Sequence, residues 1–318
     1  MKNLPPQSPG SRVIALGEHQ PSRVVTNDDL ARTVDTTDEW IQSRVGVAER
    51  RIAGPEESVV DMAVAAGGKA LAASGLTPHD IDLVIVATCT PLDQIPNTAA
   101  SVAHRLGIEA PGAFDINAAC AGFCYALSVA SDAIRGGSAG RVLVVGSEKL
   151  SDWVDWTDRS TCVIFADGAG AAIVGPDESP GIGPVVWGSA GDKAETIHLR
   201  DHAYLYQEGQ AVFRWAITEL YPVALAALER AGVAPEEVTA FVPHQANLRI
   251  VEGIARKLGA PQALIARDIV TAGNTSSASI PLALARMSGR GDLPPGSTVL
   301  TLGFGAGMTY AAQVLELP

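Results

Sequence analysis

An internal repeat constrains the fold of this 318-residue chain more than any single motif does. The segment Gly232–His244 (GVAPEEVTAFVPH) aligns without a gap on Gly75–Ala87 (GLTPHDIDLVIVA). Both segments contain a glycine, an apolar residue, a proline, an acidic residue and then an apolar strand. Matching order over several elements indicates a duplicated unit rather than chance similarity. The later matches are Arg105–Gly107 with Lys257–Gly259, Asp115–Ile116 with Asp268–Ile269, and Arg141–Gly146 with Thr298–Gly303.

Each half alternates helical and strand segments, which is typical of α/β proteins with parallel-rich sheets and helices on the sheet faces. Arg141–Ser147 (RVLVVGS) is apolar along its length, as in a strand buried on both sides. The repeat predicts a strand at Asp268–Ile269 and a helix over Asn274–Met287. Because 47% of the residues are hydrophobic, the chain can fill a large core. We expect two duplicated halves, residues 1–180 and residues 181–318.

Cys120 lies where an expected strand turns into a helix, within Asp115–Leu127 (DINAACAGFCYAL). A residue at such a turn lies beside the helix N-terminus, where free N–H groups and the macrodipole favour negative charge. A thiol there is expected to lose its proton more easily, and the thiolate is the nucleophile. Free cysteine is also among the most buried residue types. This stretch alone therefore leaves two interpretations open, a nucleophile and a small core residue.

The repeat brings two further polar residues toward Cys120. His244 ends a strand whose counterpart in the first half ends at Ala87, and Asn274 lies in the turn that corresponds to the turn of Cys120. We expect Cys120 and Asn274 at equivalent turns around a pseudo-twofold axis, which predicts a site between the halves. Taken singly, His244 could be a satisfied polar residue at a strand end, and Asn274 could be a helix N-cap.

Charge and composition exclude several classes of function. The chain carries 35 acidic against 23 basic residues, a net charge of −12, which argues against a nucleic-acid binder. Met1–Ser11 has no apolar signal region, and the apolar runs are strand-sized, so we expect a cytoplasmic protein without membrane segments. Cys120 and Cys124 are one helical turn apart, but no histidine lies at ligand spacing, so no metal site is expected.

Four motifs resemble the β-ketoacyl-acyl-carrier-protein synthase III family, the initiating condensing enzymes of the thiolase-like superfamily. They are Asp115–Phe123 (DINAACAGF), Val242–Ile250 (VPHQANLRI), Gly273–Ala278 (GNTSSA) and Gly303–Gly307 (GFGAG). The similarity runs in the family's order from about Val13 to the end. It implies an α/β fold of two pseudo-symmetric, thiolase-like βαβαβαββ halves in α-β-α-β-α layers. The first half would carry the nucleophile, and the second half the histidine and the asparagine.

The resemblance implies that Cys120 takes an acyl group from acyl-CoA, and that His244 and Asn274 bind the thioester of malonyl-acyl-carrier-protein. Loss of CO₂ from malonate creates an enolate, which two neutral N–H donors can stabilise without a change of charge. The family pattern gives the amides of Cys120 and Ala306 as the oxyanion hole for the acyl thioester. No metal is required, and no cofactor is expected beyond the CoA thioester substrate.

The resemblance also implies binding surfaces and a homodimer. Two of the residues concerned also have simpler interpretations. Arg159 could form a salt bridge with Asp155 or Asp158, and the basic face around Arg249 could be only solvated. The implied acyl-pocket residues are Ile95 and Phe304; the implied CoA-binding residues are Trp40, Arg44, Arg159, Phe213 and Asn247; and the implied carrier-protein docking residues are Gln245, Ala246, Asn247, Leu248, Arg249, Arg256 and Lys257.

Two departures from the family pattern leave the starter acyl group open. Ile95 stands where the family has an aromatic residue, and Ser189–Phe213, near the expected CoA entrance, is shorter than in related sequences. A starter for either fatty acid or polyketide synthesis is compatible with the sequence. An alternative function is a same-fold acyltransferase that passes the acyl group to another acceptor without condensation, and a further one is a non-catalytic CoA-binding or carrier-binding protein. The intact Cys120, His244 and Asn274 favour the condensing enzyme.

Overall fold

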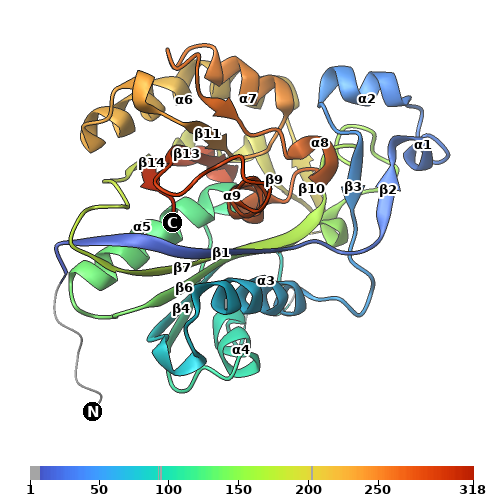
Figure 1. Ribbon diagram of the computed structural model, residues 1–318. Helices are drawn as coiled ribbons and strands as arrows, with labels where there is room; N and C mark the ends of the chain where they lie inside the picture. Colours follow the sequence, from blue (N-terminus) through green and yellow to red (C-terminus); the bar gives the residue numbers. More distant parts are fainter. Residues whose placement is uncertain (1–7, 92, 94, 202) are drawn as a thin grey trace.

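The structure is a computed structural model that describes residues 8–91, 93, 95–201 and 203–318 (Figure 1). Its first sheet has five strands in the order β1-β7-β6-β4-β5. Strand β4 pairs in parallel with β5 and with the central strand β6, while β7 runs antiparallel to β6 and β1. The strand bounds are β1 (Gly10–His19), β4 (Leu83–Ala87), β5 (Gly112–Ile116), β6 (Val142–Lys149) and β7 (Asp167–Asp177).

The second sheet repeats this topology in the order β12-β11-β13-β14-β8. Here β11 pairs in parallel with β12 and β13, while β14 runs antiparallel to β13 and β8. The predicted duplication is therefore confirmed at the level of strand order and direction. The bounds are β8 (Val186–Gly188), β11 (Ala240–Pro243), β12 (Leu264–Ile265), β13 (Thr298–Gly305) and β14 (Thr309–Glu316).

Helices form three layers around the two sheets, which confirms the predicted α-β-α-β-α arrangement (Figure 1). The middle layer is α5 (Gly122–Arg135) and α9 (Ser279–Gly289), packed between the sheets. The outer face of the first sheet is covered by α3 (Val59–Ser74) and α4 (Thr98–Arg105). The outer face of the second sheet is covered by α6 (Gly209–Ala231) and α7 (Leu248–Ala255).

Helix α6 is the one helix of the described residues that is long and apolar enough to cross a membrane. Its side chains Trp215, Leu220 and Leu228 are buried in the core that covers the second sheet. Length and composition alone also fit a core helix, and this packing favours that interpretation. Glycines with a left-handed backbone end α3 and α6 at matching points of the repeat, Gly75 (φ +69°) and Gly232 (φ +67°).

The second half departs from the predicted repeat around Asp268. The strand that pairs with β11 is Leu264–Ile265, so the strand predicted at Asp268–Ile269 is wrong. Asp268 instead precedes the short helix α8 (Ile269–Ala272). The helix predicted from Asn274 begins later, at Ser279, because Asn274 has extended backbone. Asn274 forms a parallel β-bridge with Phe165, and the Asn274 N–H donates to the carbonyl of Ile164.

Smaller elements lie beside the two sheets. One strand pair is β2 (Val24–Thr26) with β3 (Glu49–Arg51), and the other is β9 (Ile197–Arg200) with β10 (Tyr204–Gln207). Two short helices, α1 (Asn27–Leu30) and α2 (Asp38–Arg44), follow β2. The β9–β10 hairpin belongs to the region predicted near the CoA entrance, and it forms one wall of the cavity described below.

Candidate active site

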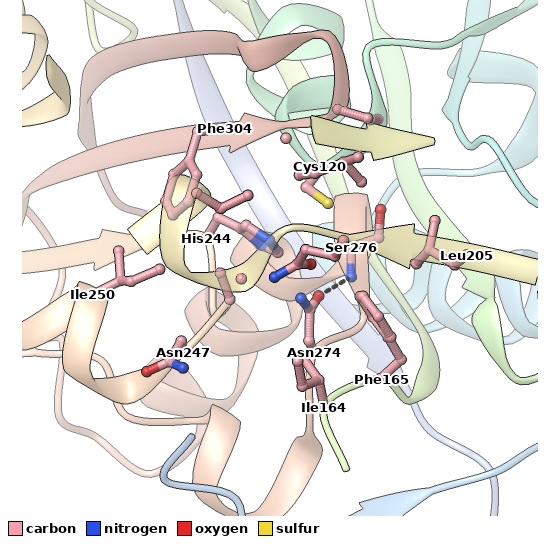
Figure 2. Close-up of a pocket in the computed structure, with 18 of the residues that line it drawn as sticks. Cys120, Ile164, Phe165, Leu205, His244, Asn247, Ile250, Asn274, Ser276 and Phe304 are labelled. Carbon is pink, nitrogen blue, oxygen red and sulfur yellow. Dashed lines mark hydrogen bonds between the residues drawn. The ribbon is translucent and has the colours of Figure 1, made fainter. Parts of the chain in front are cut away.

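A cavity of about 850 Å³ contains the three residues that the sequence predicted to meet, Cys120, His244 and Asn274. Figure 2 shows their side chains around one space, with Phe304 beside His244 and Leu205 on the side of Cys120. Cys120 comes from the first half of the chain, and His244 and Asn274 come from the second. The structure therefore brings together the three residues that the sequence predicted to meet.

Cys120 lies in a tight turn that leads directly into α5. The turn begins at Ala119, which has a left-handed backbone (φ +45°), and the Oδ1 atom of Asn117 accepts the Ala119 N–H at 3.2 Å. The facing strand β13 comes so close that a Cβ on Gly305 would lie 2.7 Å from the backbone nitrogen of Cys120. Only glycine leaves room there, so β13 and the Cys120 turn fix each other's position.

The second half contains the same turn. Ser276 has a left-handed backbone (φ +51°), and Oδ1 of Asn274 accepts the Ser276 N–H at 2.9 Å. The sequence prediction of equivalent turns is therefore confirmed. Cys120 and Asn274 occupy different positions within the two turns, because Asn274 corresponds to Asn117, and Cys120 corresponds to Ser277.

This geometry fixes the polarity of the Asn274 side chain. Asn274 is 4% exposed, and its Oδ1 atom is held by the Ser276 N–H (dashed line in Figure 2). Since the oxygen accepts from the backbone, the Nδ2 amino group is the free end and can donate into the cavity. The N-cap interpretation is wrong, because the N-cap residues of the two helices that follow are Thr275 and Ala278. The Oδ1 atom of Asn274 holds the turn instead, which leaves the donor interpretation.

His244 is held by Ser279, the first residue of α9. The Nδ1 atom of His244 lies 2.7 Å from Oγ of Ser279, which also accepts the backbone N–H of Gln245 at 3.2 Å. Among the described residues the Ser279 hydroxyl proton has no other acceptor than Nδ1 of His244, so we infer that the hydroxyl donates to Nδ1. This network assigns the ring proton to Nε2. The imidazole is 2% exposed, and burial lowers its pKa to about 3, so the ring is neutral.

Phe304 packs with its edge against His244, at 5.2 Å between ring centroids, and lines the cavity as predicted. Ile95, the other predicted acyl-pocket residue, is 89% exposed and is not among the described residues that line this chain's cavity. Its neighbours Leu92 and Gln94 lie outside the described residues.

The prediction that the turn makes the Cys120 thiol more acidic is wrong for this cavity. Burial raises the pKa of Cys120 to about 12, with a smaller opposing effect from a hydrogen bond to Ser276 and a further increase from the charge of Glu148. Burial disfavours the charged thiolate, and this effect is larger than the opposing effect of the hydrogen bond to Ser276. The thiol is therefore protonated before substrate binds.

Ala306, the second predicted oxyanion-hole residue, begins the turn after β13 and lines the cavity together with Gly305 and Cys120. The close approach of Gly305 to the Cys120 amide brings the two turns side by side. Within the described part of the chain, no group of three His, Cys, Asp or Glu side chains could hold a metal ion.

The predicted CoA-binding residues lie at one end of the cavity, and four of the five line it. The guanidinium of Arg159 lies 4.9 Å from the ring centroid of Trp40, and its Nη1 donates to the carbonyl of Asp35 at 2.7 Å. The ion-pair partner of Arg159 is Asp35, at 3.7 Å, rather than Asp155 or Asp158. The residues that line the cavity are Trp40, Arg44, Phe213 and Asn247.

Asn247 joins α7 to α2 at this end of the cavity. Its Oδ1 accepts the Arg249 N–H at 2.9 Å, and its Nδ2 donates to the carbonyl of Arg44 at 3.0 Å. The guanidinium of Arg249 lies over Phe213, at 5.1 Å from the ring centroid. Both polar atoms of Asn247 thus serve to position the chain around Arg44.

The predicted docking residues divide into exposed and buried ones. Arg249, Arg256 and Lys257 are exposed, although Lys257 also donates to the carbonyl of Ile217 at 2.6 Å. Gln245 is 1% exposed, its Nε2 donates to the Pro243 carbonyl, and its Oε1 accepts the Ile269 N–H. Its side chain is therefore structural, and the prediction that it docks a partner is wrong. Ala246, Asn247 and Leu248 are half-buried.

Sequence reasoning missed several residues that hold this site. Ser279 lies one residue beyond the GNTSSA motif, and Asn117 lies inside DINAAC, so the repeat itself contained a signal for both. Cys89 also lines the cavity, and burial followed by the charge of Glu148 raises the pKa of its thiol. Nothing in the local sequence distinguishes Cys89 from a core cysteine.

Comparisons with known proteins show the family to which the chain is similar. Residues 114–191 match the family model of 3-oxoacyl-[acyl-carrier-protein (ACP)] synthase III, and residues 228–317 match the model of its C-terminal part. Beta-ketoacyl-[acyl-carrier-protein] synthase III 4 of Streptomyces coelicolor is 55% identical over 97% of this chain and 99% of its own.

Solved structures are similarly close. The priming beta-ketosynthase of the R1128 polyketide biosynthetic pathway superposes with a TM-score of 0.96 at 44% identity, over 100% of this chain and 99% of that one. The 3-oxoacyl-[acyl-carrier-protein] synthase III of Aquifex aeolicus gives a TM-score of 0.93 at 43% identity, over 96% of this chain and 100% of that one.

Proposed function

The chain belongs to the 3-oxoacyl-[acyl-carrier-protein] synthase III family, and from that premise we propose a role for each residue of its cavity. It is an acyltransferase that initiates fatty acid or polyketide synthesis by a decarboxylating condensation. The substrates that the family implies are an acyl-CoA and malonyl-acyl-carrier-protein, and the products are a 3-oxoacyl-acyl-carrier-protein, CoA and CO₂.

In the first half-reaction, Cys120 is the nucleophile. Its sulfur attacks the thioester carbon of acyl-CoA, the bond from that carbon to the CoA sulfur breaks, and the thiol proton leaves with CoA. The backbone N–H groups of Cys120 and Ala306 donate to the carbonyl oxygen as it becomes negative. The close contact of Gly305 with the Cys120 turn supports this role, since it holds both amides on one wall.

In the second half-reaction, Nε2–H of His244 and Nδ2–H of Asn274 donate to the thioester carbonyl of the malonyl group. The bond to the carboxylate breaks, CO₂ leaves, and the electron pair remains as an enolate that the two donors stabilise. The enolate carbon attacks the Cys120 thioester. The bond from sulfur to the acyl carbon then breaks, and the thiolate takes a proton from solvent.

One observation carries this proposal: both donors are neutral, and each has its other polar atom held by the protein. Nδ1 of His244 is bound to Ser279, and Oδ1 of Asn274 is bound to Ser276. An acyltransferase without condensation has no enolate to stabilise and needs no such pair, so the pair favours condensation.

One experiment tests the assignment directly. The enzyme is incubated with labelled acyl-CoA, malonyl-acyl-carrier-protein is added, and CO₂ release is followed. We expect label on Cys120 and then CO₂, with no labelling of Cys120→Ala. An enzyme that is labelled but never releases CO₂ would contradict the proposed condensation and support transfer to another acceptor.

The binding surfaces follow from the same premise. We propose that Trp40 and Arg159 enclose the CoA adenine, with Arg44, Phe213 and Asn247 forming the adjoining wall. The cation–π pair of Arg159 with Trp40 supports this, because both groups offer flat faces to a base. The exposed Arg249, Arg256 and Lys257, with the adjoining Ala246 and Leu248, are proposed as the dock for an acidic carrier protein.

We further propose that the protein is a cytoplasmic homodimer. Each chain of the dimer is divided into two halves, residues 1–180 and residues 181–318. The exposure of Ile95 supports a position against a second copy, where it would reach the neighbouring acyl pocket. Light scattering on the purified protein measures the oligomeric state. We expect a dimer, and we expect the Ile95→Trp substitution to change the acyl-chain preference. A monomer whose acyl-chain preference is not changed by the substitution would contradict the proposal.

A further inference from the structure

We propose that Glu148 is a positioning residue for decarboxylation, because it fixes the turn that aims Asn274. This inference rests on the function proposed above for Asn274. Glu148 lies near the end of β6 and is fully buried, and no Lys or Arg of the described residues lies within ion-pair distance of its carboxylate. A buried carboxylate without a cationic partner must be satisfied by neutral donors.

The donors around Glu148 come from both halves of the chain. From the first half, Oε2 accepts the Cys89 N–H and the hydroxyls of Thr88 and Thr90, at 3.1, 3.2 and 2.7 Å. From the second half, Oε1 lies 3.0 Å from Oγ of Ser276 and 2.9 Å from Oγ of Ser277. Each of these groups carries a proton that it can donate to the carboxylate, although Ser277 shares its single hydroxyl proton with the Ala87 carbonyl at 2.8 Å.

The contacts with Ser276 and Ser277 act on the catalytic amide. Ser276 has the left-handed backbone of the turn, and its N–H holds Oδ1 of Asn274. A strained backbone of this kind persists only where surrounding contacts over-determine it. Glu148 supplies such contacts at two consecutive residues, and Gly146 of the same strand packs so closely that a Cβ there would lie 2.5 Å from the Ser277 carbonyl. We infer that the carboxylate sets the direction in which Nδ2 of Asn274 donates.

The charge of Glu148 also affects the pKa of Cys120, so the pH dependence of Cys120 alkylation is a second measurable quantity. After burial, its effect on the Cys120 thiol is to raise the pKa. Replacing the carboxylate by a neutral amide removes that effect. This shift reports the charge beside Cys120, whereas the separation of the two half-reactions reports the positioning of Asn274.

The test compares Glu148→Gln, Glu148→Asp and the parent enzyme in the two half-reactions separately. For Glu148→Gln we expect acylation of Cys120 within about threefold of the parent and CO₂ release reduced at least tenfold, since small misplacements of catalytic groups cost that much. In Glu148→Gln we expect the pH profile for alkylation of Cys120 by iodoacetamide to shift to lower pH than in the parent enzyme. Glu148→Asp keeps the carboxylate and is expected to restore most of the CO₂ release and the parent alkylation profile.

Asp167→Asn is the matched control. Asp167 is an equally buried carboxylate of the neighbouring strand β7, and it accepts from the Ala53 N–H and from Ser151 rather than from the Asn274 turn. We expect it to change the two half-reactions by the same factor. If Glu148→Gln does not fold, Ser277→Ala removes one contact of the carboxylate and should reduce CO₂ release selectively by a few fold.

Two outcomes distinguish this inference from the proposed function. If Asn274→Ala releases CO₂ at the parent rate, the function proposed for Asn274 is wrong. If Asn274→Ala loses CO₂ release while folded Glu148→Gln loses both half-reactions equally, or neither, then the positioning role is overturned and the function stands.

Discussion

Oγ of Ser279 lies 2.7 Å from Nδ1 of His244, and this contact ties the histidine to the helix that follows the Asn274 turn. His244 comes directly after β11, whereas Ser279 begins α9. The two proposed donors are therefore positioned relative to each other by one short segment. Each donor keeps one polar atom bound by the protein, Nδ1 or Oδ1, and presents the other to substrate. The cavity thus offers two N–H groups whose direction is set before substrate arrives.

Ser279→Ala should reduce CO₂ release about tenfold, because His244 loses the hydroxyl that keeps its proton on Nε2. Acylation of Cys120 should stay within a few fold of the parent. Ser131→Ala is a suitable control, since Ser131 is a buried serine whose hydroxyl pairs with Ser11 away from the cavity. Equal losses in both half-reactions for Ser279→Ala would argue against control of the tautomer.

The neutral state of His244 predicts a dependence of stability on pH. Burial lowers the pKa of His244 to about 3 in the folded protein, against 6.5 for the free side chain. Below pH 6.5 the unfolded chain therefore binds a proton that the folded protein does not, and the free energy of unfolding falls as pH falls. The slope reaches about 1.4 kcal/mol per pH unit, or about 2 kcal/mol between pH 7 and pH 5.

Urea denaturation of the parent and of His244→Gln at pH 7 and pH 5 measures this contribution. The variant lacks the titrating group, so its loss of stability on acidification should be smaller by that amount. Asp167 acts in the opposite direction, because burial raises its pKa to about 6, but it is present in both proteins and cancels. Parallel pH profiles for the two proteins would show that His244 is protonated in the fold.

Removing the guanidinium that lies over Trp40 should weaken CoA binding. Arg159→Ala loses the cation–π pair with Trp40 and a charge close to the proposed adenine site, and we expect the KM for acyl-CoA to rise about 5- to 30-fold. CO₂ release from an enzyme acylated in advance should be unchanged. Titrating CoA against the fluorescence of the protein gives the affinity directly. Arg135→Ala, an exposed arginine paired only with Asp132, should leave the KM as it is.

The proposed carrier-protein dock predicts a salt-dependent defect. Arg249→Glu reverses an exposed charge that lies over Phe213, so the KM for malonyl-acyl-carrier-protein should rise at least tenfold at low salt, and the difference should shrink as salt is added. Arg230→Glu is the control, since Arg230 is exposed and donates to the Val185 carbonyl at 2.9 Å. An unchanged KM and an unchanged salt dependence would remove Arg249 from the dock.

The sequence predicted the topology well because the repeat encodes it locally. Gly75 and Gly232 both end helices with a left-handed backbone, and the strands that follow hold equivalent places in the two sheets. The strand at Asp268 was misplaced because β12 has only two residues and carries almost no pattern of its own. A pairing so short is decided by its neighbour β11 rather than by its own residues.

The residues that meet in the cavity could be predicted from the sequence, but the protonation states of their side chains could not. Cys120 and His244 could be found from motifs, but the pKa values of their side chains depend on burial by elements distant in the chain. Glu148 shows the same limit. In the sequence it is an ordinary acidic residue after an apolar strand, and its role emerges only when Ser276 and Ser277 fold against it.

The lack of space for a side chain at Gly305 predicts a loss of Cys120 acylation when this glycine is replaced. Its backbone is extended, so an alanine is conformationally acceptable, but the added Cβ would lie 2.7 Å from the Cys120 nitrogen and 3.0 Å from the Cys120 Cβ. Because the obstacle is backbone, the Cys120 turn has to move, and both the proposed nucleophile and the proposed oxyanion hole move with it. Gly305→Ala should therefore lower acylation of Cys120 at least a hundredfold.

The matched control is Gly68→Ala, inside helix α3. A Cβ there would meet only a side-chain atom of Leu106 at an ordinary 3.6 Å. Alanine in a helix interior should raise the free energy of unfolding by up to about 1 kcal/mol and leave both half-reactions unchanged. Measuring acylation with labelled acyl-CoA beside the melting temperature separates the two effects. A folded Gly305→Ala enzyme that acylates at the parent rate would show that the contact between β13 and the Cys120 turn is not needed to place the nucleophile.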